Sequence, residues 1–157
     1  MTAEFLTLDD LAVGQIFRSA SHQLDAEQIM AFARDFDPQP FHVDEESARH
    51  TFFGGLAASG WHTAAITMRL MVASTPILGG LIGMGGEIAW PQPTRPGDIL
   101  HVESEVIEII PSRSRPDRGK VKFRITTVNQ DGQAVQILVA KLVVPTRLAQ
   151  NAETRPL

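Results

Sequence analysis

The chain has 157 residues, of which 43% are apolar and 20% charged, and its formal net charge is −4. This length can bury a hydrophobic core and the composition is that of an ordinary globular protein, so we expect a single domain over residues 1–157. The negative charge argues against nucleic-acid binding, and the absence of cysteine excludes disulfides, zinc-thiolate sites and thiol catalysis.

The first residues do not have the pattern expected of a signal peptide. Residues 1–5, MTAEF, lack a basic region followed by an apolar core, and no apolar run along the chain reaches membrane-spanning length. We therefore expect a soluble cytoplasmic protein with no membrane partner. Residues 15–21 are predicted to form a short strand.

A helix is predicted from about residue 26 to residue 36. Its apolar residues Ile29, Phe32 and Phe36 recur at helical spacing. Asp25 is a good N-cap, and Gln28 occupies the position where a capping box has Glu or Gln. The prolines that follow end this helix.

The next segment, FDPQPFHVD at residues 36–44, combines a carboxylate with an imidazole. Pro38 and Pro40 fix their own φ angles and push the preceding residues toward extended geometry, which predicts a structured loop. A fully extended run would separate Asp37 and His42 by about 17 Å. The two side chains can therefore cooperate only if the chain folds back between them.

Two further helices are predicted before residue 75. Asp44 can cap a short helix over residues 45–50, because carboxylates suit a helix N-terminus. The small-residue loop FFGGLAASG ends at Gly60, and Ser59 can cap the helix over residues 61–73. That helix is apolar nearly all round, so we expect it to be buried.

The second half of the chain is predicted to be β-structure. Glycine-rich residues 77–86 are expected to be a loop. Segments rich in β-branched residues predict strands at 87–90, 99–110, 121–128 and 134–144.

The connections and the ends of these strands complete the predicted fold. Asp131-Gly132 marks a hairpin turn between the last two strands. The last strand is apolar on both faces apart from Lys141 and two glutamines, which indicates a position inside the sheet. The simplest packing wraps the sheet around the helix over residues 61–73, giving an α+β domain, and the tail after Arg147 is expected to be frayed.

Several of these features resemble one family, the MaoC-like acyl dehydratases, which are hotdog-fold (R)-specific enoyl-CoA hydratases. The family carries Asp, any residue, Asn, Pro, an apolar residue and His, and residues 37–42 read DPQPFH, with Gln39 in place of Asn. The glycine-rich approach to Ser59-Gly60, the turn Pro96-Gly97-Asp98 and the turn over residues 129–132 are also similar. The family often has His immediately before the helix-start glycine, where this chain has Ser59.

The resemblance implies a hotdog fold, in which the sheet wraps a central helix and two subunits join their sheets. The protein would be a homodimer or a higher even oligomer, with active sites near the dimer interface. Asp37 and His42 would be the catalytic pair, and the backbone N–H of Gly60 the oxyanion donor. Ser59 and Gln39 would lie at the substrate, an acyl-CoA thioester. No metal and no cofactor other than the coenzyme A of the substrate is implied.

Each site residue also has a purely structural interpretation. Asp37 could end a helix, His42 could be a buried structural histidine, and Gly60 could permit a tight helix start. Ser59 could act only as a cap, and Gln39 could bond only to backbone.

Residues elsewhere in the chain also have both a functional and a structural interpretation. His62 could face the site from the first turn of its helix. A basic run that includes Arg113 and Arg115 could be a solvated hairpin or could contact the phosphates of coenzyme A. The histidines show no i, i+4 pair with an acid, which argues against a metal site.

Three functions follow from these features. The first is hydration of trans-2-enoyl-CoA to 3-hydroxyacyl-CoA, or the reverse dehydration, by water held between Asp37 and His42. The second is an acyl-CoA thioesterase, but such hotdog enzymes commonly use a carboxylate on the central helix, and residues 61–73 contain none. The third is a non-catalytic hotdog subunit, against which the intact Asp37 and His42 argue.

Overall fold

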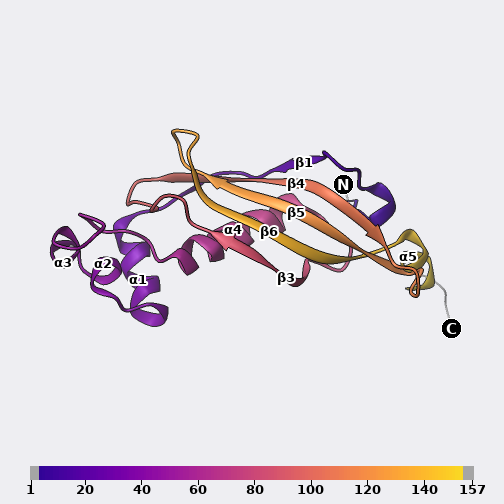
Figure 1. The fold of residues 1–157 in the computed structure, drawn as a ribbon, viewed down its shortest axis with the longest axis horizontal. Helices are drawn as coiled ribbons and strands as arrows, with labels where there is room; N and C mark the ends of the chain where they lie inside the picture. Colours follow the sequence, from indigo (N-terminus) through magenta and orange to yellow (C-terminus); the bar gives the residue numbers. More distant parts are fainter. Residues whose placement is uncertain (1–3, 154–157) are drawn as a thin grey trace.

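The computed structural model describes residues 4–153, and within them an antiparallel sheet curves around helix α4 (Gly60–Ser74) (Figure 1). The strand order is β1-β4-β5-β6-β3, with β2 paired to β4. This is the predicted α+β hotdog fold, with β6 inside the sheet as its apolar sequence indicated. The strands are β1 (Ile16–Arg18), β2 (His22–Gln23), β3 (Ile82–Ala89), β4 (Ile99–Pro111), β5 (Arg118–Val128) and β6 (Ala134–Pro145).

Short helices gather at one end of the sheet, as Figure 1 shows. They are α1 (Ala26–Phe36), α2 (Pro40–Val43) and α3 (Glu45–Arg49). All three predicted caps are confirmed, since Asp25 accepts from the Gln28 amide at 2.9 Å, Asp44 from the Ser47 amide at 2.7 Å, and Ser59 from the Trp61 amide at 3.3 Å. A 3₁₀ turn, η1 (Leu8–Asp10), and a C-terminal helix, α5 (Arg147–Glu153), complete the chain.

Some boundaries differ from the sequence-based prediction. The segment between α1 and α3 is not loop throughout, because Pro40 begins the helical turn α2 at a position where proline's missing N–H is not needed. Strand β3 begins at Ile82 within the glycine-rich run, since pairing with β6 overrides the low strand preference of glycine. Strand β1 is confined to Ile16–Arg18.

After Arg147, where the sequence predicts a frayed tail, the described chain continues as helix α5 to Glu153. The backbone N–H of Arg147 donates to Asp9 at 2.7 Å, and its guanidinium donates to Asp10 at 2.6 Å. Helix α5 is thereby fixed to η1, which is distant in sequence. Residues 154–157 lie outside the described part of the chain.

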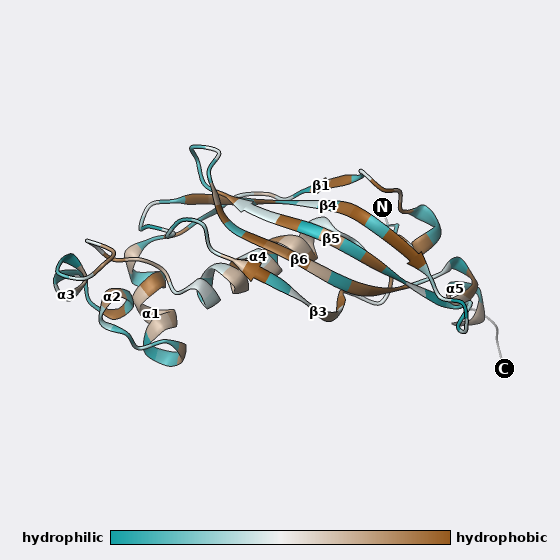
Figure 2. Cartoon of the chain, in the orientation of Figure 1, coloured by the Kyte–Doolittle hydropathy of each residue, from teal (hydrophilic) through white to brown (hydrophobic). Residues whose placement is uncertain are grey.

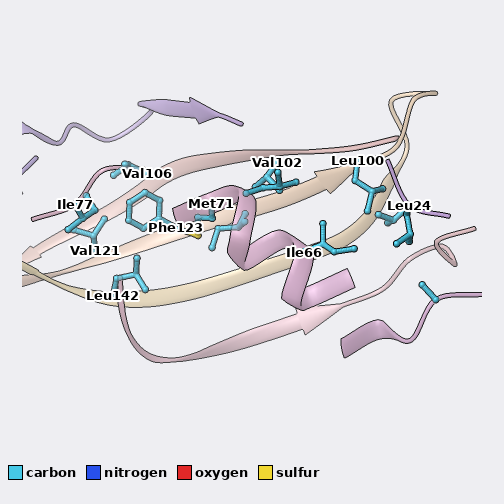
Figure 3. Close-up of a cluster of buried hydrophobic side chains, with 14 of the residues drawn as sticks. Leu24, Ile66, Met71, Ile77, Leu100, Val102, Val106, Val121, Phe123 and Leu142 are labelled. Atoms are coloured by element: carbon cyan, nitrogen blue, oxygen red, sulfur yellow. The ribbon is translucent and has the colours of Figure 1, made fainter. Parts of the chain in front are cut away.

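The core fills the space between α4 and the concave face of the sheet (Figure 3). Met71 of α4 and Phe123 of β5 are almost fully buried there. Along β5, buried and exposed residues alternate, as expected for a strand with one face on the core. Figure 2 shows the same alternation as bands of apolar and polar residues.

Helix α4 is not buried on all sides, in contrast to the prediction. Ile66, Leu70 and Met71 pack into the core, but Met68 is 47% exposed and Val72 56% exposed. Part of the apolar surface of α4 is therefore exposed in the single chain. No helix in residues 4–153 is long and apolar enough to cross a membrane.

Candidate active site

The prolines and the turn α2 bring Asp37 and His42 together. Asp37 is the C-cap of α1, and its N–H still donates to the carbonyl of Ala33. The helical turn that starts at Pro40 then reverses the chain, so His42 Nε2 lies 3.3 Å from Asp37 Oδ2. This turn supplies the fold-back that the extended geometry of the two prolines would otherwise have prevented.

The orientation of the His42 ring is fixed from its other nitrogen. Nδ1 lies 2.6 Å from the carbonyl oxygen of Ala57, which can only accept, so Nδ1 carries the hydrogen. Nε2 of the neutral ring therefore presents a lone pair to the Asp37 carboxylate. Two acceptors at this distance need a proton between them or a donor beside them. The His42 ring and the Asp37 carboxylate can therefore share the hydrogen atoms of a water molecule placed between them.

The carboxylate of Asp37 accepts from two other side chains. Gln39 Nε2 donates to Oδ1 at 2.6 Å, and Ser59 Oγ donates to Oδ2 at 2.7 Å. Burial raises the pKa of Asp37, but the hydrogen bonds from Ser59 and Gln39, with the electrostatic effect of His42, outweigh it and lower the pKa below its ordinary value of 3.8. Asp37 is therefore ionised at neutral pH.

We expect Ser59→Ala to raise the pKa of Asp37, because it removes a hydrogen bond to the charged form. An aspartate with a lowered folded-state pKa stabilises the fold above its unfolded pKa, and this stabilisation is lost as the pH falls through the folded value. The variant should therefore show a smaller loss of stability on acidification. The pKa can be measured by NMR titration of the Asp37 carboxyl carbon. Ser74→Ala, at the other end of α4, is the matched control, and an unchanged Asp37 pKa in Ser59→Ala would contradict this account.

Asp37 and His42 lie at a pocket of about 400 Å³ beside the N-terminus of α4. Gly60, the first residue of α4, also lines it. Its N–H has no carbonyl within the helix to bond to, and the helix dipole adds positive potential at this end. The pocket thus combines a proton-accepting pair with a helix terminus suited to negative charge.

Trp90 also lines the pocket, which the sequence did not predict. Trp90, just after β3, packs so closely that a Cβ on Gly60 would lie 2.6 Å from its Cε2 atom. The indole N–H donates to Gln136 Oε1 at 3.0 Å, and Gln136 is fully buried. The available sequence signal was Gln136 itself, because a glutamine in a largely apolar inner strand needs a buried polar partner, although the sequence does not identify that partner.

The remaining candidate residues lie outside the pocket. Gln39 is exposed and contacts Asp37, so its position suits orienting the carboxylate. His62 is buried against Phe32, with ring centroids 4.5 Å apart, and burial, with a contribution from His22, lowers its pKa to about 4. His62 does not line the pocket with Asp37.

The basic residues lie still further away. Arg113 and Arg115 are in the hairpin between β4 and β5, whose Asp117 carbonyl accepts from the Thr146 amide beside α5. In Figure 1, α5 lies at the opposite end of the sheet from α1, α2 and α3. The structure therefore does not bring these arginines to Asp37 and His42 of their own chain. Within residues 4–153, no three His, Asp or Glu side chains cluster closely enough to hold a metal ion.

Comparison with known proteins agrees with this fold. The structure resembles that of a MaoC-like dehydratase from Rhodospirillum rubrum, with a TM-score of 0.88 and 59% identity over 97% of this chain and 99% of that one. It also resembles the R-hydratase PhaJ1 from Pseudomonas aeruginosa, with a TM-score of 0.72 and 27% identity over 89% of this chain and 86% of that one.

Two relatives are similar in sequence. An uncharacterized Bacillus subtilis protein, YdeM, is 35% identical over 80% of this chain and 89% of its own length. A 3-hydroxybutyryl-CoA dehydratase from Methylorubrum extorquens is 31% identical over 70% of this chain and 69% of its own length. The MaoC-like domain pattern matches residues 10–129. Fold, motif and relatives together assign this chain to the MaoC-like domain family, which includes hydratases and dehydratases.

Proposed function

We propose that the protein hydrates trans-2-enoyl-CoA thioesters to 3-hydroxyacyl-CoA, or catalyses the reverse dehydration. The observation that carries this proposal is the 3.3 Å contact between His42 Nε2 and Asp37 Oδ2 in a pocket that also includes Gly60. The R-hydratase and the 3-hydroxybutyryl-CoA dehydratase among its relatives support the same reaction class.

Asp37 acts as the base on a water molecule that His42 orients. The water oxygen bonds to C3 of the enoyl group as one of its O–H bonds breaks, and Asp37 takes the proton. His42 then relays a proton from the pair to C2, so the substrate gains H and OH and both side chains return to their starting states. Proton transfer of this kind contributes about 10²- to 10⁴-fold in rate.

The thioester oxygen gathers negative charge as the water adds to C3. We assign its stabilisation to the N–H of Gly60 at the start of α4, where the unpaired amide and the helix dipole favour an anion. Ser59 and Gln39 keep Asp37 ionised and oriented through their 2.7 Å and 2.6 Å hydrogen bonds. Their role is to position the base.

The proposal is tested by incubating the protein with crotonyl-CoA. Hydration removes the conjugated double bond, so absorbance of the enoyl thioester should fall while no free thiol appears. Release of free thiol would instead identify a thioesterase, a function that the absence of Asp and Glu from α4 disfavours. No change in either signal, across a panel of 2-enoyl-CoA substrates, would leave a non-catalytic subunit as the explanation.

The same chain is proposed to form a homodimer through β3 and α4. Strand β3 is at the edge of the sheet with only β6 beside it, and its Ile82 and Met84 are 57% and 51% exposed. Met68 and Val72 of α4 are also exposed apolar residues, and a second subunit would bury them. An exposed edge and an apolar helix face in one region favour pairing with a second copy.

We expect Met84→Lys to weaken this dimer, because a charge on the edge strand opposes pairing. Sedimentation velocity should give a dimer for the parent protein and a larger monomer fraction for the variant. Phe5→Ala removes an exposed apolar side chain from outside these elements and serves as the control. A parent protein that sediments as a monomer would overturn the proposal.

Arg113 and Arg115 are remote from the active site of their own chain. If they bind the phosphates of coenzyme A, the substrate must therefore be bound by the partner subunit.

A further inference from the structure

The turn Pro96-Gly97-Asp98 is tied to two other parts of the chain. Two backbone hydrogen bonds, of 2.7 Å and 2.9 Å, join it to Leu24 just after β2. Asp98 is 6% exposed, and its carboxylate accepts from the Arg95 amide at 2.8 Å and from the Gln130 side chain at 3.0 Å. The backbone of Arg95 is therefore held in place beside the start of β4.

The side chain of Arg95 extends from this turn to the loop that follows α3. Its Nη2 donates to the carbonyl of Phe53 at 2.7 Å, and its Nη1 donates to the carbonyls of Gly55 and Leu56 at 3.1 Å and 3.3 Å. A guanidinium has a rigid planar fork of donors, so one side chain can bond several carbonyls of one loop at once. Arg95 thereby holds the first part of the loop over residues 53–58.

The 53–58 loop also carries the carbonyl that orients His42. Ala57 is fully buried, and its carbonyl accepts from His42 Nδ1 at 2.6 Å. The next amide, that of Ala58, donates to the carbonyl of Thr94 at 2.9 Å. The loop is therefore held on both sides of Ala57, by the guanidinium before it and by Thr94 after it.

We propose that Arg95 is a positioning residue that, through the 53–58 loop, fixes His42 as the tautomer with its hydrogen on Nδ1. In this tautomer Nε2 offers a lone pair 3.3 Å from the Asp37 carboxylate, which suits a shared water. If the Ala57 carbonyl moves away, the ring can instead carry its hydrogen on Nε2 and donate it directly to Asp37, because a charged acceptor makes the stronger hydrogen bond. Nε2 then has no lone pair for a water. Arg95 does not line the pocket, so it affects the site only through this loop.

The effect on the His42 ring can be measured without any substrate. Long-range proton–nitrogen NMR spectra distinguish a protonated from an unprotonated ring nitrogen, at alkaline pH where an imidazole is neutral. We expect His42 of the parent to carry its hydrogen on Nδ1. Arg95→Lys should raise the fraction protonated on Nε2 several-fold, because lysine keeps the charge but cannot reproduce the planar fork.

The effect on rate rests on the proposed hydratase function. In Arg95→Lys, kcat for crotonyl-CoA should fall about 10- to 10²-fold with KM nearly unchanged, since a small displacement of a catalytic group has a cost of this size. In Arg95→Ala, free guanidinium ion at concentrations too low to unfold proteins should restore part of kcat and of the parent tautomer, because Arg95 is half-buried and its site is open to solvent. Methylammonium, a cation without the fork, should restore neither.

Arg147→Lys is the matched control, because the Arg147 guanidinium holds α5 to Asp10 at the other end of the sheet (Figure 1). It should change neither the His42 ring nor kcat. If Arg95→Ala does not fold, Arg95→Gln removes the charge but keeps one amide donor and gives the same comparison with Arg95→Lys.

A parent ring protonated on Nε2 would overturn the inference, as would Arg95 variants that keep the parent tautomer, whatever their kcat. A changed tautomer with the parent kcat would overturn its link to the reaction. A parent protein without hydratase activity, in which the tautomer still depends on Arg95, would overturn the proposed function and leave the positioning role of Arg95 standing.

Discussion

Asp37→Asn is expected to lower kcat for enoyl-thioester hydration by about 10²- to 10⁴-fold, because the amide cannot take a proton from water. The substitution preserves the shape of the side chain. Its oxygen can still accept from Gln39 or Ser59, and its NH₂ group can donate to the lone pair on His42 Nε2. The fold should therefore survive, and the loss should appear in kcat rather than in KM.

The matched control is Asp44→Asn, the same chemical change seven positions later in the chain. Asp44 caps α3 through the Ser47 amide, and asparagine is an equally good N-cap. Activity should therefore be close to that of the parent. Stopped-flow or steady-state assays with crotonyl-CoA, alongside circular dichroism, give both readouts. Asp37→Asn with a rate near that of the parent would exclude Asp37 as the base.

His42→Asn should cause a loss of similar size, and its amide can still supply a donor on the side of the Ala57 carbonyl. If Asp37 and His42 act on one water, the double variant should be little worse than either single variant, because groups that act as a unit are strongly non-additive. Additive losses would instead indicate that the two side chains work in separate steps.

Gly60→Ala is expected to lower both stability and activity, although alanine usually stabilises a helix relative to glycine. The Cβ of the alanine would lie 2.6 Å from Cε2 of Trp90 and 2.8 Å from two further indole carbons. Movement of the Trp90 ring away from this Cβ would break its hydrogen bond to Gln136. Overpacking of this kind costs about 1–3 kcal/mol. Displacing the amide at the helix start should also lower kcat by about 10²- to 10³-fold, as loss of an oxyanion donor does.

A double-mutant cycle with Trp90→Leu tests the cause. If the clash with the indole is responsible, Gly60→Ala should cost much less stability in the Trp90→Leu background than in the parent, as measured by urea denaturation. Gly55→Ala is the control, because the nearest atom to its added Cβ is Arg95 Nη1 at 3.6 Å, an ordinary contact. Equal costs in the two backgrounds would show that the contact with Trp90 is not what requires glycine.

Local chemistry accounts for the parts of the fold that the sequence predicted well. Asp25 and Asp44 cap their helices because a side-chain oxygen reaches an amide only three residues away. The Asp131-Gly132 turn lies where predicted, with Gly132 at a φ of 74° that favours glycine. Helix α4 also has nearly its predicted bounds.

Errors arose where a distant partner decided the local structure. The glycine-rich segment from Ile82 is a strand because β6 pairs with it, and the start of α5 is held to η1 by the bonds from Arg147 to Asp9 and Asp10. A local pattern contains no information about such partners. The apolar character of α4 was read correctly, but burial on all sides was wrong because the sheet covers only one side of the helix.

For the site, the sequence by itself determined the chemical groups: a carboxylate and an imidazole close together in the chain, and a glycine at the start of an apolar helix. Only the tertiary structure decided their geometry, with His42 turned by the Ala57 carbonyl, Asp37 bonded by Ser59, and Trp90 fixed against Gly60 by Gln136. The physical reason is the separation along the chain of the residues that decide each feature. Caps, turns and helix periods depend on residues a few positions apart, whereas the orientation of a catalytic side chain depends on hydrogen bonds and packing between segments that only folding brings together.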